Sequence, residues 1–217
     1  MRSTDDLSTR ARIRDAAITV FGEEGFGVGV RAIAAAAGVS PGLVNHHFGS
    51  KDGLREACDD RVREVIRAAK LESLERPSPN GLLAQMAEIE DFAPYLAYLL
   101  RSLQAGGSLM TVFFDHMVED IQGYLAAGIA AGTLRAPRDL PAMAKYFAIT
   151  NGGGIIMFLQ LYAATHEGRV DYRKALREYA DRMMLPALEI LTHGLLTDSM
   201  MLDTLTQQQH ENTQENP

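Results

Sequence analysis

The chain has 217 residues, 47% of them hydrophobic, which is enough apolar material to build a substantial folded core. Its single cysteine, Cys58, excludes an intramolecular disulfide, and no charged-then-apolar stretch resembles a secretion signal, so we expect a location in the reducing cytoplasm. The net charge of −7 comes from the C-terminal part: residues 1–76 carry twelve basic and twelve acidic side chains, whereas residues 77–217 carry nine and sixteen. A locally basic surface near the N-terminus is therefore compatible with the acidic total.

Apolar residues recur at intervals of three and four along nearly the whole chain, which predicts an all-α fold. The first helix carries an apolar stripe over 13–21 and is expected to end before Gly25. A short second helix over 30–37 is stopped by Gly38. The longest uninterrupted apolar runs, such as 155–159, fall well short of the ~18 residues that a membrane helix needs, so we expect no contact with a membrane.

A third helix is predicted directly after the second. Ser40 offers an N-cap oxygen, Pro41 suits the first helical position, and Gly49 closes the helix after two turns. Ser50 then caps a long, charged fourth helix that extends to the break at 76–81.

The C-terminal part is expected to contain further amphipathic helices over 82–89, 94–104, 109–131, 141–165 and 172–196. Pro186 is expected to kink the last of them, because its ring clashes with the carbonyl four residues back.

Three regions follow from this pattern. We predict an N-terminal domain over residues 1–56 and a larger helical domain over 57–203. The tail over 204–217 is rich in Gln, Asn, Thr and Glu and has no apolar periodicity, so we expect it to be disordered.

Two short helices joined by a turn that contains glycine, the second starting with Ser-Pro, form the pattern of a helix-turn-helix. Val44 and Phe48 share one stripe and should pack on Ile33 and the first helix. The outward face then consists of Gly42, Leu43, Asn45 and His46. Small, aliphatic and hydrogen-bonding side chains suit the DNA major groove, where Asn pairs with adenine and an aliphatic group touches the thymine methyl.

The run from Arg31 to Leu54 resembles the DNA-binding signature of the tetracycline-repressor (TetR) family, particularly its actinobacterial members, and the similarity covers roughly residues 9–60. The resemblance implies that the helix over 41–47 enters the major groove and that Lys51 meets a phosphate, as do His47 and groups near Arg31. A helix N-terminus favours an anion, which agrees with this role for Lys51. The expected DNA-binding residues are Arg31, Ser40, Pro41, Gly42, Leu43, Asn45, His46, His47 and Lys51.

Met and aromatic side chains of the C-terminal domain are individually ordinary core candidates, but together they could wall an adaptable apolar pocket. The family resemblance favours a pocket for a small-molecule inducer. The expected ligand-binding residues are Met86, Tyr95, Tyr98, Phe113, Met117, Phe147, Asn151 and Phe158. Three consecutive glycines, 152–154, cost roughly 1 kcal/mol each in a helix, which requires either a close neighbouring helix or room for a ligand.

The two last long helices carry more apolar positions than one domain can bury, and in the resembled family the corresponding pair forms a four-helix bundle with a second subunit. The expected homodimer interface includes Ala180, Met184, Leu188, Leu191 and Leu195.

These features predict a repressor without catalytic activity or a cofactor, which binds an inverted-repeat operator in double-stranded DNA as a homodimer and is released by a small hydrophobic ligand. One alternative is a DNA-binding or architectural protein that needs no ligand. Another is a helical enzyme that uses His116 and Asp120, which share a helix face. Metal binding by His46 and His47 is not expected, because adjacent helix residues point about 100° apart.

Overall fold

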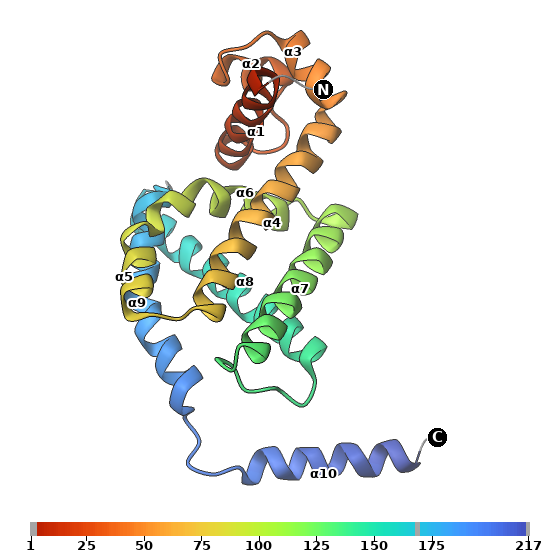
Figure 1. The fold of residues 1–217 in the computed structure, drawn as a ribbon, viewed down its shortest axis with the longest axis vertical. Helices are drawn as coiled ribbons and strands as arrows, with labels where there is room; N and C mark the ends of the chain where they lie inside the picture. Colours follow the sequence, from red (N-terminus) through yellow and green to blue (C-terminus); the bar gives the residue numbers. More distant parts are fainter. Residues whose placement is uncertain (1–3, 168–169, 216–217) are drawn as a thin grey trace. The chain divides into compact units, whose positions relative to one another are not determined.

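The computed structural model describes residues 4–167 and 170–215, and over these residues the chain is all-α. The N-terminal helices are α1 (Thr4–Glu24), α2 (Val30–Ala36), α3 (Pro41–Phe48) and α4 (Lys51–Glu75). They are followed by α5 (Pro79–Ala87), a 3-10 turn (Ile89–Phe92), α6 (Ala93–Gln104), α7 (Gly107–Ala130), α8 (Leu140–Thr165), α9 (Tyr172–His193) and α10 (Met200–Glu215) (Figure 1). The chain divides into two compact units, Met1–Glu178 and Tyr179–Pro217.

The helix boundaries around the predicted helix-turn-helix follow local chemistry. The Ser40 hydroxyl accepts a hydrogen bond from the Leu43 N–H (3.3 Å) and the Ser50 hydroxyl accepts one from the Gly53 N–H (3.0 Å), which caps α3 and α4. Gly38, with φ of 65°, lets the chain leave α2 in the left-handed region that other residues avoid. The predicted starts and ends of these helices agree with the structure to within one residue.

A fully buried cluster holds the N-terminal helices together. It contains apolar side chains from α1, α2, α3 and the first half of α4, together with Tyr98 from α6. Its largest members are Ile13, Ile18, Phe21, Ile33, Val44, Leu54, Val62 and Tyr98. The core of the helix-turn-helix therefore includes Tyr98 of α6, which lies 50 residues beyond Phe48, the last residue of α3.

Helix α6 packs against α1 at short range. A Cβ atom added to Gly22 would lie 2.9 Å from the Cβ of Ala97, which shows how closely the two backbones approach. The Arg101 guanidinium donates hydrogen bonds to the carbonyls of Gly22 and Glu23, both at 3.1 Å. These carbonyls belong to the last turn of α1, where no helical N–H is available to them.

Helix α4 continues past this cluster to pack against α7. Arg63 donates to both oxygens of Asp120, at 2.7 and 3.2 Å, and the Thr133 hydroxyl donates to the carbonyl of Leu74 (2.6 Å). A second, smaller cluster centred on Ile121, Ala144 and Ala148 joins α7 to α8. Helix α4 thus spans the distance from the helix-turn-helix to the C-terminal helices of the same unit.

Helix α8 is the one described helix that has the length and composition to cross a membrane, with a mean hydropathy of 1.3 over an 18-residue window. Core helices of soluble proteins meet the same two criteria, so the finding does not by itself indicate a membrane.

The end of the chain differs from the sequence-based expectation. Helix α9 ends at His193 and Gly194 follows with φ of 73°, so Leu195 lies outside the helix that was predicted to run to 196. Residues 204–215, expected to be disordered, belong to α10, while 216 and 217 lie outside the described residues. Asp198 accepts from the Met200 N–H (3.0 Å) and so satisfies one free donor at the start of α10. The Gln and Glu residues that follow are good helix formers.

Candidate nucleic-acid interface

The inner face of α3 anchors it to α2 and α1. Val44 is 1% exposed and Ile33 is fully buried, while Val39 and Phe48 pack against the same cluster. This is the orientation that the spacing of apolar residues predicted. Because the inner face is fixed by burial, the opposite face of α3 is held in a defined direction.

The outer face of α3 is open to solvent. Pro41, Gly42, Asn45 and His46 are exposed, and Leu43 is half-buried. The Ser40 hydroxyl is occupied by the N-cap bond, so its structural role is capping. The rings of His46 and His47 are in edge contact at a centroid distance of 5.4 Å, and His47 is half-buried. The structure thus presents three predicted base readers on one face: Asn45, His46 and the aliphatic Leu43.

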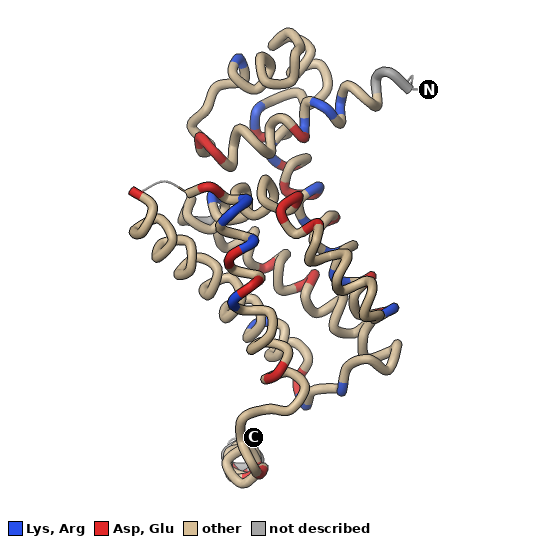
Figure 2. The backbone as a smooth tube through the Cα atoms, turned by 90° about the vertical axis from the view of Figure 1, so that its left-hand side faces the viewer, with Lys and Arg blue, Asp and Glu red and all other residues tan. Residues whose placement is uncertain are grey.

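Basic side chains are sparse at this surface. Between Glu24 and Lys51 the single Lys or Arg is Arg31, which is exposed at the start of α2. Along α4, by contrast, Lys and Arg are interspersed with Asp and Glu (Figure 2). A DNA complex of this surface would rely on few cationic side chains and on the N–H groups of helix ends.

Lys51 lies at the first position of α4, next to α3. Its ammonium donates a hydrogen bond to the carbonyl of Phe26 (2.6 Å), in the turn that joins α1 to α2. An ammonium has three donors, so this bond holds the side chain in place and leaves two donors for a phosphate oxygen. The sequence predicted the phosphate contact but not this anchoring bond.

Two arginines pack against aromatic rings of the helix-turn-helix and of the turn that precedes it. The Arg10 guanidinium lies over the Phe48 ring, 4.8 Å from its centroid, and the Arg55 guanidinium lies over the Phe26 ring at 3.7 Å. Cation–π contacts of this kind contribute about 0.5–1 kcal/mol at exposed sites and more when water is excluded. The periodicity of apolar residues gives no signal for them, because each joins residues that are at least 29 positions apart.

Comparison with known proteins places this geometry in a family. The family described as "Bacterial regulatory proteins, tetR family" matches residues 13–58, and "Tetracyclin repressor-like, C-terminal domain" matches residues 90–197. The HTH-type transcriptional regulatory protein RaaS of Mycobacterium tuberculosis is 53% identical over 203 residues, which cover 94% of this chain and 93% of that protein.

The chain belongs to the TetR family of transcriptional regulators.

Two solved structures share the fold. A TetR transcriptional regulator from Chloroflexus aurantiacus is 22% identical, covers 83% of this chain and 98% of its own, and has a TM-score of 0.52. Salmonella enterica GusR is 22% identical, covers 85% of this chain and 97% of its own, and has a TM-score of 0.51. At this level of identity the likeness concerns the architecture alone.

The residues expected to bind a ligand in this TetR-family chain include members of two different clusters. Tyr98 is fully buried in the N-terminal cluster, where its hydroxyl donates to Asp59 (2.6 Å), and Tyr95 packs against the same cluster. Burial raises the pKa of Asp59 and that of Tyr98. Met117 and Phe147 pack in the cluster between α7 and α8.

The other four candidates lie on three helices, α5, α7 and α8. Phe113 is 5% exposed, Met86 and Phe158 are half-buried, and Asn151 is exposed. None of the eight lines either of two surface hollows of about 360 and 350 Å³. A Cβ added to Gly152 would make ordinary contact with Met117 at 3.9 Å, and one added to Gly153 would meet no atom within 4 Å. Close helix packing therefore does not account for these two glycines.

The expected dimer residues all lie in the second unit. Ala180 is 4% exposed, Met184 is half-buried, and Leu188, Leu191 and Leu195 are 40%, 64% and 76% exposed. In the first unit, α8 also exposes large apolar side chains: Met143, Tyr146, Ile149, Met157 and Leu161. Ala180 is already buried within one chain, so the surface available to a partner begins beyond it.

The pair considered for catalysis is not isolated from other charges. Both oxygens of Asp120 accept hydrogen bonds from Arg63 of α4, so this carboxylate joins two helices. Among the described residues there is no group of three or more His, Cys, Asp or Glu side chains that could hold a metal ion.

Proposed function

We propose that this TetR-family regulator is a repressor that acts in the cytoplasm, binds an inverted-repeat operator as a homodimer and leaves the operator when a small hydrophobic ligand binds. The observation that carries the proposal is the exposed face of α3, with Gly42, Asn45 and His46 outward and Val44 fixed in the core behind them. A two-turn helix whose outer face carries small and hydrogen-bonding side chains fits the major groove.

Each predicted contact has a distinct physical role. Asn45 supplies the amide that pairs with adenine, and Leu43 supplies an aliphatic contact for a thymine methyl. Arg31, His47 and Lys51 are assigned to phosphates, together with the free backbone N–H groups at the start of α3. With so few cations, the salt dependence of binding is expected to be shallow for each subunit.

Dimerisation would supply the second recognition helix. Two α3 helices related by a twofold axis and about 34–36 Å apart would read two half-sites one DNA turn apart. The exposed apolar side chains of α8, and separately those of α9, are the proposed contact surfaces, because exposed apolar area of this kind is an aggregation liability in a monomer.

Release by a ligand requires that the ligand prefers one of two states. Moving the population from 99:1 to 1:99 takes a difference in binding free energy of ~5.5 kcal/mol between the DNA-competent state and the other state. A regulator that needs no ligand is the alternative, and it predicts that hydrophobic compounds leave the melting temperature of the purified protein unchanged.

The test begins with DNA enriched by the protein from genomic fragments, which identifies the operator. Lys51→Gln removes a charge but keeps an N–H donor, so we expect weaker binding to all sequences and a salt slope lower by about one. Asn45→Ala should instead reduce discrimination at one base position by ~1–3 kcal/mol. Arg135→Ala, which removes an exposed arginine between α7 and α8, is the control. An unaltered binding motif in Asn45→Ala, or a full salt slope in Lys51→Gln, would remove that residue from the interface.

A further inference from the structure

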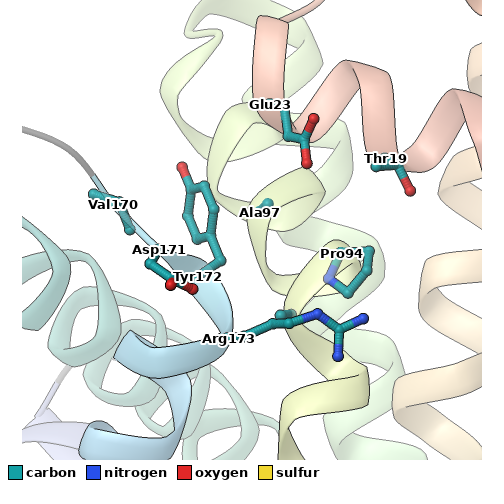
Figure 3. Close-up of a pocket in the computed structure, with 9 residues that line it drawn as sticks. Thr19, Glu23, Pro94, Ala97, Val170, Asp171, Tyr172 and Arg173 are labelled. Carbon is teal, nitrogen blue, oxygen red and sulfur yellow. The ribbon is translucent and has the colours of Figure 1, made fainter.

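A hollow of about 360 Å³ lies between α1, α6 and the start of α9 (Figure 3). Glu23 comes from the last turn of α1, Pro94 and Ala97 come from α6, and Tyr172 and Arg173 open α9. Small-molecule sites typically have volumes of roughly 300–1,000 Å³, so the hollow is large enough for a compact organic molecule. None of the residues expected to bind an inducer lines it.

The floor of the hollow is apolar. Ala97 and its neighbour Ala93 are each 3% exposed, and Pro94 adds a ring with no N–H group. The first turn of α6 therefore offers few donors to a bound anion, although helix N-termini generally favour anions. A ligand of this hollow would bury hydrocarbon against α6.

The charges around the rim are unequally paired. Asp171 accepts from the Lys174 N–H (3.2 Å) and lies 3.4 Å from the Lys174 ammonium, and the backbone bond holds the pKa of Asp171 below its usual value. Arg173 lies 3.5 Å from Asp91. Within the described part of the chain, the Glu23 carboxylate has no hydrogen bond or ion pair, and it faces the hollow (Figure 3). The charge left to attract a ligand is therefore negative.

Tyr172 supplies the second element of recognition. Its half-buried ring lines the hollow from the α9 side, and Glu23 lines it from the α1 side (Figure 3). An aromatic face together with a carboxylate is the combination that attracts an organic cation, through the ring quadrupole and the opposite charge. We propose that this hollow binds a small organic cation that has an ammonium group and an apolar body.

The hollow lies where a bound ligand could affect the arrangement of the DNA-binding helices. Glu23 adjoins Gly22, where α1 approaches α6 closely, and the Glu23 carbonyl accepts a hydrogen bond from Arg101 of α6. A ligand seated between the two helices would bind more strongly to one arrangement of this joint than to another. This step rests on the proposed operator binding, and it implies that ligand and DNA alter each other's affinity by the same factor.

The probe is benzyltrimethylammonium, and the neutral near-isostere 2-methyl-1-phenyl-2-propanol is the matched compound. Calorimetric titration of the full chain without DNA should show binding of the cation and at least about tenfold weaker binding of the alcohol. Glu23→Gln should weaken binding of the cation by about tenfold, and Tyr172→Leu should do the same. Glu24→Gln removes the adjacent exposed carboxylate of α1, which does not line the hollow, and should leave the affinity unchanged.

The possible results distinguish the proposed cation site from its alternatives. Equal binding of the cation and the alcohol, no binding of the cation, or equal affinities for wild type and Glu23→Gln would overturn the site. Stronger binding of benzylphosphonate than of the cation would replace it with an anion site at Arg173. Operator affinity is then measured with and without saturating cation: no change would overturn the coupling and leave the site in place. A chain that binds no operator would refute the proposed function, while the titration without DNA would still decide the site.

Discussion

Asp59 is a half-buried carboxylate whose oxygen accepts a hydrogen bond from the Tyr98 hydroxyl (2.6 Å). Burial raises its pKa above the ordinary value of 3.8, and the bond from Tyr98 and the nearby Arg55 only partly oppose this. As the pH rises from about that value, the unfolded chain loses its proton first, so the free energy of unfolding falls until the raised native pKa is passed. Below the ordinary value both states are protonated and the contribution is fully present.

Asp59→Asn lacks this titration but keeps an acceptor for Tyr98. We therefore expect the unfolding free energy of Asp59→Asn, relative to wild type, to rise with pH across that window. Urea denaturation at a series of pH values above 3.8 measures it. Asp60→Asn changes the adjacent exposed carboxylate and is the control. A constant difference between Asp59→Asn and wild type would contradict the burial of the charge.

Cys58 is fully buried in the N-terminal cluster, and burial raises the pKa of its thiol to about 12. The thiolate is the reactive species, so we expect native protein at neutral pH to react with a disulfide reagent only when the cluster opens. The rate of reaction is measured from the absorbance of the coloured thiol that the reagent releases, with and without denaturant. Labelling of native protein at the speed of a free thiol would show that the cluster is open to solvent.

At this scale the sequence predicted the faces of α3 correctly, because burial of Val44 and exposure of Asn45 follow from helical spacing alone. It assigned Tyr98 to a ligand pocket, whereas the structure places that ring beside Phe21 and Phe26. A tyrosine on an apolar stripe suits either location. The choice depends on how α6 meets α1, and periodicity within one helix contains no information about that contact.

The close approach of α1 and α6 predicts the behaviour of Gly22. A Cβ at this position would lie 2.9 Å from the Ala97 Cβ and 3.0 Å from the Tyr98 backbone nitrogen. Gly22→Ala should therefore destabilise the protein by about 1–3 kcal/mol, because the helices must separate. Adding Ala97→Gly should restore part of the loss, since it removes the Ala97 Cβ, the nearest of the atoms that the new Cβ would meet.

Thermal and urea denaturation of the single and double variants measure this effect. Gly27→Ala is the control, because a Cβ there meets no atom within 4 Å. If Gly22→Ala were as stable as wild type and Gly27→Ala were not, the contact between α1 and α6 would be assigned incorrectly.

The element boundaries show which sequence signals are reliable. Ser40, Ser50 and Gly38 mark helix ends through specific hydrogen bonds or a positive φ, and the structure agrees at each. The prediction was wrong for α9, where Gly194 was passed over in favour of the apolar Leu195 and Leu196. It differed for α10, because absence of an apolar stripe was taken as disorder although Gln-rich segments form helix well.

At the scale of the whole molecule, the proposed dimer gives the main prediction. Leu191 of α9 is 64% exposed, so Leu191→Glu should leave the folded chain intact but place a charge in the apolar contact. We expect a loss of several kcal/mol of association, and operator affinity should fall with it although every residue of α3 is unchanged. Leu83→Glu in α5, also at a 64% exposed leucine, is the control.

Sedimentation at micromolar concentration and operator titration, performed on both variants, measure these effects. The proposed interface is wrong if wild type sediments as a monomer, or if monomeric Leu191→Glu keeps full operator affinity. The sequence predicted exposed apolar surface, because the last two long helices carry more apolar residues than one domain can bury. It could not predict which of those residues are exposed, because Ala180 is buried by contacts within one chain.

The participation of Tyr98 in the N-terminal cluster bears on how such regulators can be recombined. A natural cassette for exchanging DNA specificity would be the predicted domain 1–56, but the cluster that supports α3 also contains Cys58, Val62 and Tyr98. If residues 1–56 were replaced by those of another family member, the new core side chains would not match these three in shape. The resulting cavities or overlaps would cost several kcal/mol of stability. Transplanted operator preference should therefore require that the residues at 58, 62 and 98 travel with the recognition helix.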